Sequence, residues 1–274
     1  MRPPRASASF AERYGPWALV TGASSGIGAE FARQLAARGL HVVLVARRAD
    51  RLAELARSLE QRYAVQTLSV PLDLARPECV AALQAAVGER RVGLLVNAAG
   101  FALTGPLLDV PSDQHRALLA VNCQAPMLLA HAFGQLMAAR RRGGIVFVAS
   151  LVSYAPTPYW SHYAASKAYT RFIGQGLGHE LRRHRVDVLT LCPGFTQTEF
   201  MAAAGVRAVG AQPAEAVVRQ ALAELGRRSV VVPGPINRLA SLLARFAPQP
   251  LVVWTAGSII HRLRTGPARN ACVT

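Results

Sequence analysis

The fold of this chain is decided by the stretch Trp17-Ala18-Leu19-Val20-Thr21-Gly22-Ala23-Ser24-Ser25-Gly26-Ile27-Gly28. Its first four residues are a short apolar run, which is typical of a buried strand. A glycine-rich turn follows at once, and apolar residues then recur at helical spacing at Ile27, Phe31 and Leu35, up to Gly39. The order of strand, glycine turn and helix predicts the first unit of an alternating α/β fold.

The same alternation continues along the chain. Apolar runs predict further strands at 41–46, 66–72, 92–96, 145–149, 186–191 and 230–232. Helical periodicity predicts helices at 51–62, 78–88, 114–139 and 163–183. Because βαβ units build a parallel sheet with helices on both faces, we expect a Rossmann-like, doubly wound α/β domain of about seven strands. Ligands of such sheets bind at the carboxyl ends of the strands.

Size and composition indicate a single domain. The chain has 274 residues, 51% of them hydrophobic, and no linker, repeat or low-complexity tract divides it. The net charge of +16 comes from arginines that are spread out, with only short clusters at 140–142, 182–183 and 227–228. No recognisable nucleic-acid module accompanies them, so we expect solvated faces and no nucleic-acid partner.

The first residues of the chain and its cysteines both favour a cytoplasmic location. Pro3, Pro4 and Glu12 stand where an export signal would need an apolar core. The cysteines lack a C-x-x-C pair or a nearby histidine cluster, so we expect reduced thiols, no metal and a cytoplasmic protein; they are Cys79, Cys123, Cys192 and Cys272.

The only lysine of the chain is Lys167, although the chain has 31 lysines and arginines in all. It lies four residues after Tyr163, so on a helix both side chains share one face. A compact ammonium can touch a sugar hydroxyl and a phenol together, which a flat guanidinium cannot, and its charge can lower the pKa of the phenol. A second cation, such as an oxidised nicotinamide, would have to help. Chance spacing is the alternative.

The glycine turn favours a phosphate ligand. Gly22, Gly26 and Gly28 allow a tight turn and a close approach of the backbone, and the helix after them offers free amides. At the end of the second predicted strand, Arg47 stands where an acid would bind a 2′-hydroxyl, which favours the 2′-phosphate of NADPH. Asp73 could accept a hydrogen bond from the adenine amino group or serve in an ordinary turn.

These residues resemble the short-chain dehydrogenase/reductase family of the common NAD(P)-dependent type, over nearly all of residues 14–235. Thr21-Gly22-x-x-x-Gly26-x-Gly28 is similar to its cofactor turn, and Asn97-Ala98-Ala99-Gly100 to its Asn-Asn-Ala-Gly stretch, with Ala98 in place of the second asparagine. Ser150, Tyr163 and Lys167 are similar to its catalytic set, which Asn122 completes. Pro193-Gly194, followed by Thr196 and Thr198, resembles the segment that closes over the nicotinamide.

The resemblance implies hydride transfer between NADP(H) and a carbonyl or alcohol carbon. Tyr163 would be the general acid or base, Ser150 would bind the substrate oxygen, Lys167 would hold the ribose, and Asn122 would hold a proton-relaying water. His162 is set aside as a base, since it has no carboxylate at triad spacing. The implied cofactor-binding residues are Thr21, Gly22, Ser24, Ser25, Gly26, Ile27, Gly28, Arg47, Asp73, Asn97, Ala98, Gly100, Tyr163, Lys167, Pro193, Gly194, Thr196 and Thr198.

We expect residues 195–209 and the tail from Pro235 onward to form the lid and the pocket wall. Their apolar side chains favour a hydrophobic ketone or secondary alcohol, such as a steroid, fatty or aromatic carbonyl. Residues near Val231 to Arg238 also resemble a lipid- or steroid-directed branch of the family. Tyr154, Tyr159 and Met201 belong to the same apolar surroundings. The expected substrate contacts are Ser150, Tyr163, Val152, Trp160, Phe195 and Phe200.

Three parts of the chain follow: a flexible N-terminus at 1–13, the catalytic and cofactor-binding domain at 14–235, and an extension at 236–274. The extension combines apolar blocks with Arg238, Arg245, Arg262 and Arg264, so it could be a lid, a subunit contact or a membrane-surface segment. The family pattern implies a homodimer or homotetramer. Two alternatives stay open: a catalytically silent NADPH sensor, and a peripheral protein of a membrane surface.

Overall fold

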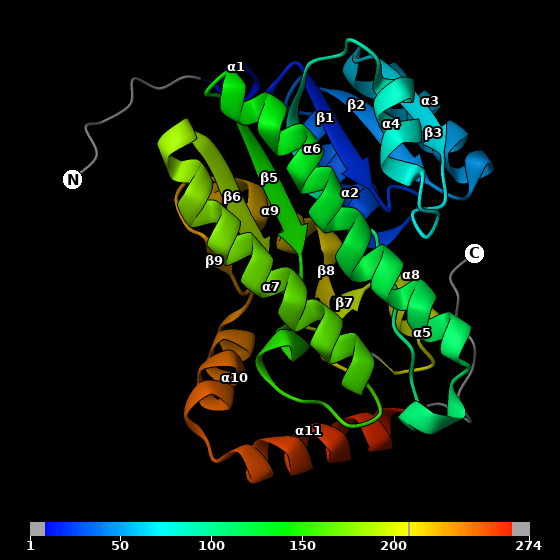
Figure 1. The fold of residues 1–274 in the computed structure, drawn as a ribbon, viewed down its shortest axis with the longest axis vertical. Coiled ribbons are helices and arrows are strands. Elements are labelled where there is room, and N and C mark those ends of the chain that lie inside the picture. Colours follow the sequence, from blue (N-terminus) through cyan, green and yellow to red (C-terminus); the bar gives the residue numbers. More distant parts are fainter. Residues whose placement is uncertain (1–8, 208, 265–274) are drawn as a thin grey trace.

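A computed structural model of the chain describes residues 9–207 and 209–264 (Figure 1). Its central sheet has seven parallel strands in the order β3-β2-β1-β4-β5-β6-β9. This confirms the predicted doubly wound α/β fold, whose strand order reverses between β1 and β4. The strands are β1 (Trp17–Thr21), β2 (His41–Ala46), β3 (Thr67–Pro71), β4 (Val92–Asn97), β5 (Gly143–Val148), β6 (Val186–Leu191) and β9 (Val230–Val231).

Helices cover both faces of the sheet, and α6 and α7 cross in front of it in Figure 1. A small second sheet pairs β7 (Thr196–Gln197) with β8 (Gln212–Pro213). The helices are α1 (Phe10–Tyr14), α2 (Gly26–Ala36), α3 (Ala49–Tyr63), α4 (Cys79–Val87), α5 (Ser112–Leu119), α6 (Ala125–Ala139), α7 (Ser161–Leu181), α8 (Glu199–Ala203), α9 (Ala214–Glu224), α10 (Pro235–Phe246) and α11 (Gln249–Leu263). Short 3-10 turns lie at Leu107–Asp109, Leu151–Tyr154 and Arg182–His184.

The core consists of two apolar layers, one on each face of the sheet. Alternate residues of a strand point to opposite faces, so Ala18 and Val20 of β1 pack with α2, α3 and α9, while Leu19 packs with α4 and α6. Every residue of β1, β4, β5 and β6 is buried. Burial on both faces explains why β1, β4 and β5 are almost continuous apolar runs. In β6, the buried carboxylate of Asp187 is paired with Arg13.

The structure differs from the sequence prediction at three places. The helix expected at 114–139 is interrupted by a π-helical turn, Ala120–Gln124, between α5 and α6. Of the expected flexible N-terminus, residues 1–8 lie outside the described residues, whereas α1 begins at Phe10 because Ser9 and Glu12 form a capping box. Of the extension at 236–274, residues 265–274 lie outside the described residues, as does Cys272, and the rest forms α10 and α11.

Helix α7 offers a matched test of this packing. A Cβ on Gly174 would lie 2.2 Å from Thr190 Oγ1 of β6 and 3.1 Å from Phe147 Cδ2 of β5, whereas a Cβ on Gly176 would meet nothing within 4 Å. We therefore expect Gly176→Ala to stabilise the protein by about 0.5–1 kcal/mol and Gly174→Ala to destabilise it by about 1–3 kcal/mol. Urea unfolding of both variants measures this. Equal effects would mean that α7 does not pack on the sheet as described.

Candidate active site

The turn between β1 and α2 is built by close backbone contacts. Gly22 has φ +68°, and a Cβ on Gly28 would lie only 2.2 Å from the Gly22 carbonyl oxygen, so neither position accepts a side chain. Ser25, the N-cap of α2, makes no side-chain capping hydrogen bond to any described residue. The first amides of α2 therefore remain available to an anion, and the turn fits the pyrophosphate of a dinucleotide.

Below this turn, Thr21 holds the segment after β4. Its Oγ1 accepts hydrogen bonds from the backbone N–H groups of Ala98 and Ala99, both at 3.1 Å, and donates one to the Val96 carbonyl at 3.4 Å. Asn97 Nδ2 donates to the Pro126 carbonyl at 3.3 Å, while its buried Oδ1 has no partner among the described residues. The support that a second asparagine would give at Ala98 is thus replaced by backbone contacts to Thr21.

Arginine side chains gather beside the glycine turn. Arg47 is exposed and lines the same cavity as the turn. The neighbouring Arg48, which the sequence analysis did not select, donates from Nε and Nη2 to Ser24 Oγ at 3.3 and 3.1 Å. Its Nη1 also lies 3.2 Å from Glu199 of α8, whose other oxygen lies 3.3 Å from Arg51. Two arginines and Ser24 thus offer several donors to a phosphate beside the glycine turn.

The loop after β6 reaches over the glycine turn. A Cβ on Gly26 would lie 3.0 Å from Thr198 Cγ2, so this loop and the turn are in contact. Thr196 Oγ1 donates to the Gly194 carbonyl at 3.1 Å, and Thr198 Oγ1 to the Thr196 carbonyl at 3.4 Å. On the opposite side, Asp73 lines the cavity, and its Oδ1 accepts from the Ala75 N–H at 2.9 Å. Its predicted contact with adenine stays a prediction.

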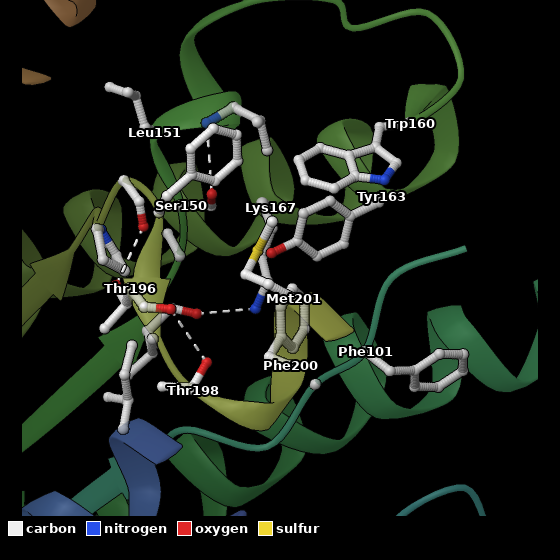
Figure 2. A pocket seen from close by; sticks show the side chains of 18 of the residues that line it. Phe101, Ser150, Leu151, Trp160, Tyr163, Lys167, Thr196, Thr198, Phe200 and Met201 are labelled. Carbon is white, nitrogen blue, oxygen red and sulfur yellow. Dashed lines mark hydrogen bonds between the residues drawn. The ribbon is translucent and has the colours of Figure 1, made fainter. Parts of the chain in front are cut away.

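Ser150, Tyr163 and Lys167 lie together at the bottom of the cavity and point toward one another (Figure 2). Lys167 Nζ donates to the Val148 carbonyl at 2.9 Å and lies 5.8 Å from the centre of the Tyr163 ring. Tyr163 packs edge-on against Trp160 at 5.4 Å between ring centroids and lies near Phe200 at 5.8 Å. Two hydroxyls and one ammonium thus converge within an apolar wall.

Burial shifts the pKa values of this pair in opposite directions. Tyr163 is 4% exposed and Lys167 5% exposed. Burial raises the pKa of the Tyr163 phenol, against a smaller lowering by the hydrogen bond from Ser150, and it lowers the pKa of Lys167 to about 8. In the protein alone, the pKa of Tyr163 is therefore raised by desolvation and not lowered, as had been predicted from the neighbouring Lys167.

Asn122 lies in the π-helical turn between α5 and α6, the kind of irregularity that often marks functional positions. Its Oδ1 accepts from the Phe101 N–H at 3.1 Å, and its Nδ2 donates to the Phe101 carbonyl and to Ser166 Oγ, both at 3.0 Å. The side chain therefore ties the loop after β4 to α7. A Cβ on Gly100 would lie 3.0 Å from Asn122 Oδ1 and 3.1 Å from Lys167 Nζ, so Gly100 leaves the space between them open.

One continuous cavity of about 960 Å³ brings most of the predicted site residues together. All of the predicted cofactor and substrate residues line it except Thr21 and Asn97, which lie just below. Val152, Trp160, Phe195 and Phe200 form part of its apolar wall. The rest of that wall includes Phe101, which the sequence did not single out. It also includes Met201 of the expected lid and one side of α10 and α11, in the tail that was expected to form pocket wall, with Leu243, Leu251, Val252, Ile259 and Ile260.

Some aromatic and histidine side chains of the sequence analysis lie outside this cavity. Tyr154 stacks with Arg171 and Arg245, and Tyr159 packs on His261 and Arg264, so both anchor neighbouring helices instead of contacting a substrate. His162 turns toward α5, where its Nδ1 lies 2.7 Å from Nδ1 of His115.

Comparison with curated proteins finds related reductases and dehydrogenases as well as relatives that are named inactive. The chain is 34% identical over 221 residues to a very-long-chain 3-oxoacyl-CoA reductase of Laccaria bicolor. The matching region covers 79% of this chain and 65% of that protein. It is 31% identical over 259 residues to the inactive hydroxysteroid dehydrogenase-like protein 1 of Mus musculus. This matching region covers 92% of this chain and 78% of that protein.

Solved structures agree with these relatives. A 7β-hydroxysteroid dehydrogenase superimposes with a TM-score of 0.85 at 26% identity, over 91% of this chain and 99% of that one. A short-chain dehydrogenase from Sphingobium yanoikuyae in complex with NADPH gives a TM-score of 0.77 at 34% identity, over 83% and 92%. The family model for short chain dehydrogenases matches residues 16–208. The resemblance seen in the sequence is thereby confirmed: this chain belongs to the short-chain dehydrogenase family of oxidoreductases.

Proposed function

We propose that this chain transfers a hydride between NADP(H) and a hydrophobic ketone or secondary alcohol. The observation that carries the proposal is the convergence of Ser150, Tyr163 and Lys167 at the bottom of an apolar cavity that continues to the glycine turn. A volume of about 960 Å³ suits a dinucleotide together with part of a second molecule. The relatives named for 3-oxoacyl-CoA and hydroxysteroid substrates support a large apolar carbonyl compound.

The cofactor would be held by the glycine turn, by Arg47, Arg48 and Ser24 at its phosphate, and by Lys167 at its ribose. When bound, the nicotinamide supplies or accepts the hydride. The chain's own hydroxyls do the rest: Ser150 donates a hydrogen bond to the carbonyl oxygen, and Tyr163 gives its proton to that oxygen as negative charge develops there. A phenol with a raised pKa stays protonated until a neighbouring positive charge stabilises its anion, so Tyr163 holds the proton that a general acid must donate to the carbonyl oxygen.

A silent NADPH-binding protein is the second candidate, and the inactive mouse relative is the observation that favours it. The two candidates differ only in whether the hydroxyl groups of Ser150 and Tyr163 take part in a reaction. Both would bind NADPH, whereas only an enzyme needs the Tyr163 proton.

Tyr163→Phe separates these candidates. For an enzyme, NADPH consumption with a panel of hydrophobic ketones should fall by about 10²–10⁴, since acid catalysis is lost while the affinity for NADPH stays the same. Tyr169→Phe is the matched control, because Tyr169 lies on the same helix, is 37% exposed and does not line the cavity. Unchanged turnover in Tyr163→Phe contradicts the proposed mechanism, and tight NADPH binding without turnover in the unmodified protein favours the silent binder.

Cofactor preference should depend on the arginines beside Ser24. Replacing Arg47 or Arg48 by alanine should lower the preference for NADPH over NADH on the order of ten- to a hundredfold, because a charge-assisted hydrogen bond to the 2′-phosphate is lost. Arg51→Ala is the control, since Arg51 shares Glu199 with Arg48 but does not line the cavity. Dissociation constants from nicotinamide fluorescence measure the effect. A loss of equal size for NADH and NADPH would refute a 2′-phosphate site.

The burial of Lys167 predicts a pH-dependent stability. Its pKa is about 8 in the folded protein against 10.5 for an ordinary lysine, so between these values the unfolded chain holds more protons. The free energy of unfolding of the wild type, relative to Lys167→Met, should therefore rise by about 2 kcal/mol from about pH 7.5 to about pH 9.5. Urea unfolding of both proteins at each pH gives this difference. If the free energies of unfolding of the two proteins changed in parallel over that pH range, Lys167 would not be desolvated in the folded protein.

A further inference from the structure

We propose that the hairpin of α10 and α11 docks on the surface of an anionic lipid bilayer, and that the cavity receives its substrate from that bilayer. The second half of this statement rests on the proposed function, whereas the first half does not. The hairpin lies beyond the carboxyl ends of β5 and β6, at one end of the molecule (Figure 1).

Exposed apolar side chains are concentrated on this hairpin. Of the 15 large hydrophobic residues that are exposed in the described part of the chain, eight lie on these two helices, which indicates a surface adapted to an apolar environment. Ile236 is 81% exposed, Phe246 80% and Trp254 69%. The other five are Leu239, Leu242, Leu243, Leu251 and Ile259.

The apolar and charged residues of α10 lie on separate faces. At 100° per residue, Ile236, Leu239, Leu243 and Phe246 share one arc, while the buried Ser241 lies on the other side, toward the protein. The exposed arginines of the helix, Arg238 and Arg245, are seven residues apart and therefore lie on one line along the axis, between the exposed Leu242 and the buried Ser241. This is the arrangement of an interfacial helix, whose apolar face enters the lipid while arginines reach the headgroups.

The charge of the segment fits anionic lipid. After Glu224 the sequence contains no aspartate or glutamate, yet it contains seven arginines up to Thr274. Basic residues near an anionic leaflet strengthen binding, and the effect weakens with salt. A second copy of this chain is the poorer occupant. In a two-fold contact the same arginines would face one another, and neither hairpin offers a carboxylate to pair with them.

The contact is peripheral. Helices α10 and α11 have 12 and 15 residues, which is too short to cross a bilayer. Within residues 9–207 and 209–264, only the stretch Ser112–Ala139 has the length and composition of a spanning helix, and its inner face packs in the core against the sheet.

The apolar surface continues into the cavity. Ile236, Leu243, Leu251 and Ile259 are each more than half exposed and also line the cavity, so its mouth opens between the two helices through an apolar rim. A ketone with a long apolar chain can pass through this rim from the acyl region without entering water, which disfavours such a chain. The docking surface and the entrance are therefore the same place.

Trp254 is a built-in reporter for the docking test. The chain has three tryptophans, all within the described residues, and Trp17 and Trp160 are only 8% and 3% exposed. With the full-length protein, we expect emission of Trp254 to shift to shorter wavelength and to be quenched by brominated lipid when vesicles of phosphatidylcholine with about one third phosphatidylglycerol are added. Co-sedimentation should be at least about tenfold weaker with pure phosphatidylcholine, and high salt should reduce it.

Paired variants identify the surface. Leu239→Asp with Phe246→Asp replaces two exposed residues that do not line the cavity and should lower vesicle binding more than about tenfold. Leu136→Asp with Phe172→Asp, equally exposed on α6 and α7, should not. Arg238→Gln with Arg245→Gln should weaken binding to anionic vesicles, unlike Arg227→Gln with Arg228→Gln at the far end of the segment. Thermal unfolding monitored by circular dichroism confirms that each variant is folded.

The outcomes separate docking from the proposed function. Equal binding to both vesicle types with unchanged Trp254 emission, or full binding by the Leu239/Phe246 variant, would overturn the docking surface. If the protein forms a concentration-dependent dimer that the Leu239/Phe246 variant breaks, and does not bind vesicles, the hairpin belongs to a contact with a second copy and the docking surface is also overturned.

Vesicle binding without NADPH oxidation on any ketone leaves docking intact and counts against the proposed function alone. Substrate entry is supported if the variant slows reduction of a long-chain ketone held in vesicles but not of a short soluble ketone, and is overturned if both rates are unchanged.

Discussion

The hydrogen bond from Lys167 Nζ to the Val148 carbonyl, at 2.9 Å, fixes the relation between α7 and the end of β5. A buried ammonium needs an acceptor, because an unpaired charge in an apolar interior is strongly destabilising. This contact places Tyr163, one turn earlier on α7, beside Ser150, which follows β5. The hydrogen bonds of Asn122 to Ser166 and to Phe101 attach the loop after β4 to the same helix. The position of every polar group at the bottom of the cavity thus depends on α7.

The same burial that orders the site suppresses its charges. A phenol with a raised pKa and an ammonium with a pKa lowered to about 8 describe a site in which each group is more easily neutral than in water. A positive charge brought close to Tyr163 within this apolar wall therefore changes the proton affinity of the phenol far more than it would at the protein surface. In the proposed reaction, the apolar wall therefore affects proton transfer from Tyr163 as well as substrate binding.

Most of the fold was predictable because its signal is local. His41–Ala46 and Val186–Leu191 were predicted with their observed ends, since apolar runs bounded by polar residues leave little choice. The π-helical turn at Asn122 was missed because α6 is apolar on nearly all sides, so the shift in helical phase that an extra residue causes leaves no visible break in the sequence pattern. The doubly wound parallel sheet of about seven strands followed from the βαβ alternation, and the structure confirms it.

The site was predictable where a motif fixes both identity and spacing, as for Ser150, Tyr163 and Lys167. The site was not predictable where two residues adjacent in the sequence could fill the same role. Arg47 and Arg48 are adjacent in the sequence, and only the backbone direction after β2 shows that Arg48 reaches Ser24. Tyr154 and Tyr159 looked like substrate contacts, but arginines of other helices stack on them. The apolar tail from Pro235 onward was expected to form part of the wall. Which side chains of α10 and α11 line the cavity depends on how this distant segment folds back, which no local pattern encodes.

The central claim is that a hydride passes from the cofactor to a ketone at this site. The most direct test incubates the protein with NADPH that carries deuterium at nicotinamide C4 on either face and a mixture of hydrophobic ketones, and then examines the alcohols by mass spectrometry. One of the two labelled cofactors should deliver a single deuterium to the carbinol carbon. Alcohol that forms without deuterium from either cofactor, or bound NADPH that is never oxidised by any ketone, would contradict it.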